Sequence, residues 1–83
     1  MAGETVRERL AGLVAVACEG EVSAAEAVAA PSLALVGVSS LASLRVIDLV
    51  EREFGVVLDL DADPAVLDSV DGLAGYLAAH GVR

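Results

Sequence analysis

The residues of this chain that could do chemistry are few and far apart. Cys18 is the only cysteine, and His80, near the other end, is the only histidine. A catalytic thiol needs a neighbouring base, so we expect Cys18 to be a small buried side chain and His80 to end a helix. A single cysteine excludes an intrachain disulfide, which fits a reducing, cytoplasmic compartment.

An alternating acidic segment, Asp59, Asp61 and Asp63, looks like the start of a calcium-binding loop. The continuation does not fit, because Pro64 stands where such a loop requires glycine and Val70 stands where it requires a bidentate glutamate. We therefore predict a solvated acidic loop and no metal site.

The serine pair Ser39–Ser40 follows Gly37 and precedes a long apolar pattern. A serine in that position caps a helix. A serine at a junction between a loop and a helix is also exposed to a modifying enzyme. A phosphate attached there is favoured by the free N–H groups and the dipole of the helix N-terminus. Capping alone would explain one serine without any further function.

Helical periodicity predicts the elements that position this pair. The first helix begins at Glu4 or Thr5 and ends near Gly20. A long loop follows, with a helical turn from Ser23 through Val28. Three further helices are expected: one from Ser39 or Ser40 to Gly55, a short one over Pro64–Leu67, and a last one from Ser69 to Gly81. The predicted fold is all-α, a small antiparallel bundle of three main helices and one short one, in a single domain of residues 1–83.

Each main helix carries an apolar stripe that we expect to form the core. The stripes consist of Val6, Leu10, Leu13, Val14 and Ala17, then Leu41, Leu44, Ile47, Val50 and Phe54, and finally Val70, Leu73 and Leu77. Hydrophobic residues make up 57% of the chain, with one Phe and one Tyr, so small aliphatic side chains must fill this core.

The formal net charge is −8, with thirteen acidic residues against five arginines. Such a surface repels nucleic acid and favours basic protein partners. No apolar run approaches the length of a membrane span, so we expect no membrane partner.

The segment Val36–Leu41 is similar to the Leu-Gly-x-Asp-Ser-Leu motif of carrier proteins. Downstream, Glu51–Gly55 resembles the acidic pair, Phe and Gly that end the family's second helix, and Ser69–Val70 resembles its Thr-Val start of the last helix. From Leu35 to Leu77 the chain resembles the acyl carrier proteins.

This resemblance implies that the protein is no enzyme. A phosphopantetheinyl transferase would attach 4'-phosphopantetheine to Ser40, and separate acyl-loading and condensing enzymes would then use the arm of a free-standing, monomeric carrier. The docking surface is expected at the start of the second main helix and in the acidic loop. Its residues would be Ser39, Leu41, Ala42, Arg45, Asp48, Arg52, Asp61 and Asp63.

Two departures from the family pattern qualify this interpretation. Ser39 replaces the aspartate that precedes the modified serine, and Arg45 dilutes an exposed face that is strongly acidic in fatty-acid carriers. A carrier for polyketides or another specialised product is therefore favoured. Val38, where peptidyl carriers repeat glycine, favours acyl over aminoacyl cargo. A peptidyl carrier and an unmodified acidic interaction domain stay open as alternatives.

Overall fold

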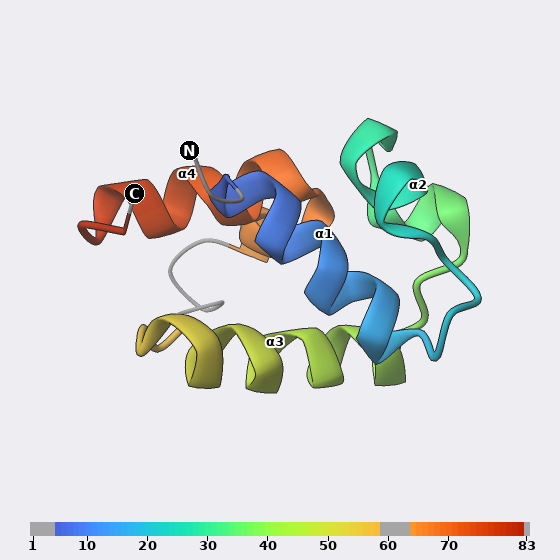
Figure 1. Ribbon diagram of the computed structural model, residues 1–83, viewed down its shortest axis with the longest axis horizontal. Coiled ribbons are helices and arrows are strands. Elements are labelled where there is room, and N and C mark those ends of the chain that lie inside the picture. Colours follow the sequence, from blue (N-terminus) through green and yellow to red (C-terminus); the bar gives the residue numbers. More distant parts are fainter. Residues whose placement is uncertain (1–4, 59–63, 83) are drawn as a thin grey trace.

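The computed structural model describes residues 5–58 and 64–82 and is all-helical (Figure 1). The described elements are the α-helices α1 (Val6–Ala17), α2 (Ala24–Ala29), α3 (Ser40–Phe54) and α4 (Val70–Ala79), with the 3-10 helices η1 (Leu33–Val36) and η2 (Pro64–Asp68). The predicted small helical bundle is confirmed. The first loop contains a two-turn α-helix, α2, whereas the segment after Pro64 is a 3-10 helix.

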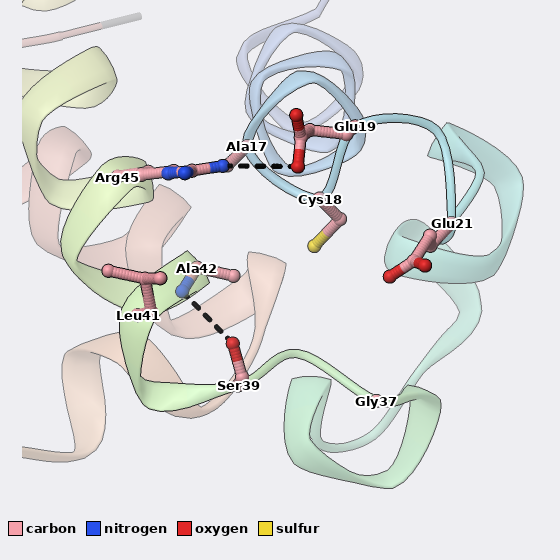
Figure 2. A pocket seen from close by; sticks show the side chains of 9 residues that line it. All are labelled: Ala17, Cys18, Glu19, Glu21, Gly37, Ser39, Leu41, Ala42 and Arg45. Carbon is pink, nitrogen blue, oxygen red and sulfur yellow. Dashed lines mark hydrogen bonds and ion pairs between the residues drawn. The ribbon is translucent and has the colours of Figure 1, made fainter.

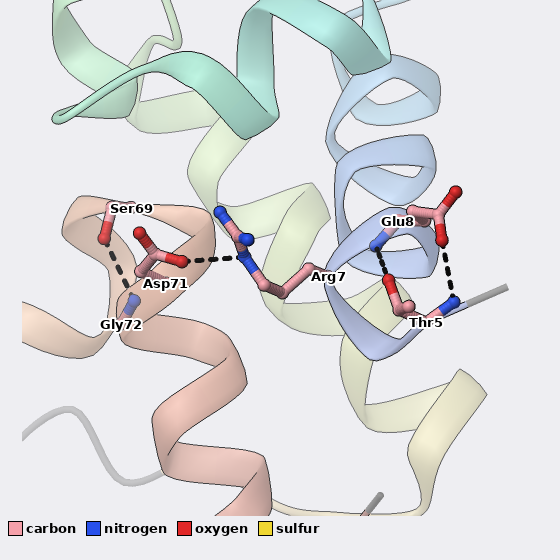
Figure 3. A network of polar contacts seen from close by, with 6 residues as sticks. All are labelled: Thr5, Arg7, Glu8, Ser69, Asp71 and Gly72. Carbon is pink, nitrogen blue, oxygen red and sulfur yellow. Dashed lines mark hydrogen bonds and ion pairs between the residues drawn. The ribbon is translucent and has the colours of Figure 1, made fainter.

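Capping side chains determine where the first two helices begin. The Thr5 hydroxyl accepts a hydrogen bond from the Glu8 backbone N–H (3.1 Å), and the Glu8 carboxylate accepts one from the Thr5 N–H (3.0 Å; Figure 3). Ser23 and Glu26 form the same reciprocal pair, both at 3.1 Å. Each pair satisfies two backbone donors that lack an intrahelical partner, which fixes the first turn.

Single serines cap the other two α-helices. Ser39 accepts from the Ala42 N–H at 3.1 Å, and Ser69 accepts from the Gly72 N–H at 3.0 Å. At the far end of α3, Gly55 closes the helix in the left-handed conformation, with φ of 67°. The helix boundaries predicted from these residues are confirmed.

Helix α1 is the centre of the bundle, because it packs against each of the other three α-helices. In Figure 1, α3 and α4 both run opposite to α1. Ion pairs reinforce these contacts: Arg7 meets Asp71 at the start of α4 at 2.8 Å (Figure 3), and Arg9 pairs with Glu53 near the end of α3. The reversal of α3 brings its first turn beside the last turn of α1.

The core is aliphatic, as the composition requires. Its fully buried large side chains are Leu10, Val14, Val46, Val50, Val70, Leu73 and Leu77. The predicted inner residues of α4 are confirmed, and those of α1 are confirmed with Val6 and Leu13 only partly buried.

The predicted inner stripe of α3 is wrong in its first half. Leu41 and Leu44 are 61% and 63% exposed, and Ala42 and Val46 are buried instead, whereas Val50 is buried as predicted. Residues three apart are offset around a helix by about 60° per step, and residues four apart by about 40° in the opposite sense, so the two rows face different directions. The row at four-residue spacing, with its small Ala42, faces the bundle. Ile47 and Phe54 pack at the edge of the core.

The segment before α3 forms the 3-10 helix η1, which only some of its aliphatic residues anchor to the core. In η1, Leu33 is buried and Val36 packs against the core, but Leu35 is 75% exposed. Of the helices in the described part of the chain, none has the length and apolarity that a membrane span requires.

Candidate functional site

A tight turn at Gly37 precedes the serine pair Ser39–Ser40. Gly37 has φ of 96°, a left-handed conformation that disfavours other residues. Its N–H donates to the Ala34 carbonyl at 3.2 Å, and the Val38 N–H donates to the Leu33 carbonyl at 3.2 Å. The chain then enters α3 in extended conformation at Ser39. The turn therefore fixes the position of both serines at the surface.

The two serine hydroxyls have different environments. The Ser39 hydroxyl accepts the capping hydrogen bond from Ala42 (Figure 2), so its oxygen is engaged in holding the helix. Ser40 is the first residue of α3 and is exposed, and within the described residues its hydroxyl takes part in no hydrogen bond. Of the two, Ser40 is the side chain that an external enzyme can reach without unfolding a cap.

The first turn of α3 contains no acidic residue. The N–H groups and dipole of the helix therefore act there without a competing carboxylate. A phosphodiester on Ser40 fits this environment, because its negative charge would meet a partial positive charge.

The exposed face of α3 carries most of the residues expected to contact partners. Leu41 and Leu44 are exposed, and charged residues flank them: Arg45 pairs with Glu19 (3.5 Å), and Arg52 pairs with Asp48 (3.2 Å). An apolar groove of about 380 Å³ runs beside them between α1 and α3, lined in part by Val16, Leu44 and Leu49.

Three of the expected contact residues need separate mention. Ala42 was expected to be exposed, but it is buried, because it lies on the row that faces the bundle. Asp61 and Asp63 lie outside the described residues.

Two exposed apolar residues beside this face were not predicted as contact residues. They are Leu44 and Val16, which is 65% exposed, and both fall in apolar patterns that predict a buried face.

A shallow pocket lies between the end of α1 and the start of α3 (Figure 2). The ion pair of Arg45 with Glu19 crosses it, and the Cys18 thiol lies between that pair and Ser39 in this view. Cys18 is buried, as expected. Burial raises the pKa of the Cys18 thiol, and the negative charge of Glu21 raises it further. Cys18 is therefore a neutral thiol at neutral pH.

We expect Cys18 to react with iodoacetamide several-fold more slowly in the folded protein at neutral pH than in urea, because both burial and the raised pKa reduce the accessible thiolate. Mass spectrometry of timed samples gives the rates. As a control, Glu21→Gln should speed the native reaction only slightly, since burial is the larger cause. Equal rates in native and unfolded protein would contradict the burial of Cys18.

His80 lies at the C-terminal end of α4. In Figure 1 this end of α4 is on the left of the molecule, whereas α3 begins on the right. Its ring stacks on Tyr76 with centroids 4.2 Å apart, and Nδ1 is 2.9 Å from the Tyr76 carbonyl oxygen. The histidine thus ends a helix, as expected, and is not paired with Ser40. Across residues 5–58 and 64–82, no group of three or more Asp, Glu, Cys or His side chains is placed to hold a metal ion.

No model of a protein family, no curated protein and no solved structure matches this chain.

Proposed function

We propose that this chain is an acyl carrier protein that bears 4'-phosphopantetheine on Ser40. The observation that carries the proposal is the state of the Ser40 hydroxyl: exposed, without a hydrogen bond in the described chain, and beside a second serine that already caps the helix. A helix cap alone requires one serine, and Ser39 fills that role. The attached arm supplies a terminal thiol that holds acyl groups as thioesters.

Coenzyme A is the donor of the arm in the proposed attachment reaction. The Ser40 oxygen forms a bond to the phosphorus that carries the pantetheine, the pyrophosphate P–O bond breaks, and adenosine 3',5'-bisphosphate leaves. No carboxylate or imidazole in the described chain hydrogen-bonds to Ser40, so the hydroxyl proton goes to a base of the transferase. The first turn of α3 then stabilises the new phosphodiester.

Partner enzymes would dock on the exposed face of α3. Any enzyme that receives an arm from Ser40 must approach this end of the helix. Leu41 and Leu44 offer apolar contact area there, and exposed aliphatic side chains within a charged rim are a common basis for protein association. Tethering raises the effective concentration of a bound substrate at each partner's active site. The rim contains both signs of charge, which favours partners of specialised biosynthesis over those of fatty-acid synthesis.

Arg45→Glu is expected to slow acyl transfer to the cognate partner a few-fold and to improve acceptance by fatty-acid enzymes. Exposed charge contacts are each worth about 1 kcal/mol or less and act mainly on association rate. Transfer kinetics at low and high salt with both enzyme sets give the measurement, and the difference should shrink at high salt.

Glu19→Gln is the matched control for Arg45→Glu, because it removes the ion pair with Arg45 but keeps the arginine charge. If Glu19→Gln reproduces the full effect, the ion pair and not a partner contact of Arg45 is responsible. If Arg45→Glu changes neither enzyme set, docking on this face of α3 is wrong.

Intact mass spectrometry tests the proposal directly. Incubation with coenzyme A and a broad-specificity phosphopantetheinyl transferase should add one arm per chain. An unmodified interaction domain would use the same apolar face of α3 but would show no mass increase. Loading of the arm with an aminoacyl group in place of an acyl group would identify a peptidyl carrier.

A further inference from the structure

A separate groove lies between α1 and α2, and no residue of α3 lines it. It encloses about 310 Å³ and is lined by Glu8, Ala11, Ala24, Ala25 and Val28. Ala11 is fully buried and Val28 is half-buried, whereas Ala24 and Ala25 are exposed. The groove is therefore open to solvent, with an aliphatic lining and one exposed carboxylate.

The part of the chain that forms this groove is acidic. Between Arg9 and Arg45 the sequence has no basic residue, and this interval contains Glu19, Glu21 and Glu26. Glu19 pairs with Arg45, but Glu26 is exposed on α2, and no ion pair of the described chain neutralises it. The exposed face of α3 carries both signs of charge, so the two surfaces differ in the partners that they attract.

Glu8 keeps one carboxylate oxygen available to a partner. Its Oε1 accepts the hydrogen bond from the Thr5 N–H, whereas its Oε2 accepts none from the described residues (Figure 3). The hydrogen bonds with the backbone and then the side chain of Thr5 lower the pKa of the Glu8 carboxyl, so this group is charged at neutral pH. The neighbouring Arg7 is paired with Asp71 at 2.8 Å and forms no ion pair with Glu8.

We propose that this groove is a second docking surface, which receives a basic amphipathic helix from a partner protein. The small side chains of Ala24 and Ala25 let a partner helix approach closely. Its aliphatic residues contact Ala11 and Val28 at the bottom of the groove, and lysine or arginine residues beside them reach the Glu8 carboxylate.

Two other occupants are disfavoured by the same charges. A second copy of this chain would bring its own acidic groups against Glu8 and Glu26, and an anionic lipid surface would be repelled in the same way. A basic partner helix is attracted, and it leaves the exposed face of α3 free. The inference goes beyond the proposed carrier function, because such a partner can hold the protein near its enzymes while one of them docks on α3.

NMR titration of the unmodified, isotope-labelled protein tests this inference independently of the arm. The probe is an amidated helical peptide of leucine, alanine and lysine, with the leucines on one face. Saturable amide shift changes are expected at Ala11 and residues 24–28, with little change at residues 41–48. Matched peptides with glutamate in place of lysine, or serine in place of leucine, should bind at least about tenfold more weakly. Shift changes centred on α3, or equal binding of the serine peptide, would overturn the proposed groove.

Ala25→Arg and Ala29→Arg separate docking in the groove from general electrostatic attraction. Both alanines are exposed on α2, and both substitutions add one positive charge, but only Ala25 lines the groove. Ala25→Arg should weaken binding of the lysine peptide at least about tenfold, whereas Ala29→Arg should weaken it less than about threefold. Circular dichroism checks that both variants fold. Equal effects of the two substitutions would overturn the docking site, and so would a dimer in analytical ultracentrifugation that Ala25→Arg abolishes.

Discussion

Ser40→Ala is expected to abolish attachment of the arm completely, whereas Ser39→Ala should be modified to the same final extent as the native protein. The Ser40 oxygen is the atom that forms the new bond, and nothing replaces it. Ser39 contributes the helix cap, so its loss costs about 1 kcal/mol of stability and leaves the acceptor in place. Intact mass and tandem mass spectrometry after incubation with coenzyme A and transferase give the result.

Circular dichroism should show that Ser40→Ala is folded, since alanine is well tolerated in the first turn of a helix. A folded Ser40→Ala protein that still gains an arm would show that Ser39 or Ser43 is the acceptor. In that case the motif alignment is displaced and the proposed site is wrong.

Leu73→Ala is expected to leave much of the protein unfolded. Leu73 has no exposed surface, and truncating a buried leucine costs about 2–5 kcal/mol through lost transfer energy and the cavity that remains. A domain of this size has a total stability of about 5 kcal/mol. Urea denaturation followed by circular dichroism measures the loss.

Leu44→Ala is the matched control, because it makes the same chemical change on a side chain that is 63% exposed. Its stability should stay within about 0.5 kcal/mol of the native value. Comparable losses in the two variants would mean that α3 turns Leu44, and not Ala42 and Val46, toward the bundle.

Helix boundaries were predictable because caps are local. Ser23 with Glu26, and Ser69, mark their helices by interactions that span three residues. The inner face of α3 was not predictable in the same way, since its apolar residues fall on two rows. Tertiary packing against α1 selects the row with Ala42, and that choice depends on residues distant in sequence.

The same contrast between local and tertiary interactions applies to the candidate site. The motif favoured Ser40 over Ser39, and the structure adds that the Ser39 hydroxyl accepts the capping hydrogen bond from the Ala42 N–H. A groove beside Ser40, lined in part by Ser32 and Asp68, could not be found from the sequence, because Ser32 precedes η1 and Asp68 ends η2, on either side of α3 in the chain.

The central place of α1 has a consequence for biosynthesis of the chain. Helix α1 is made before α4, whose buried Leu73 and Leu77 complete the core around it. While the polypeptide is still emerging from the ribosome, α1 and α3 can associate, but the apolar surface of α1 that α4 covers stays open to water. Nascent chains that lack α4 therefore offer an incomplete target to any modifying enzyme and a more exposed one to chaperones.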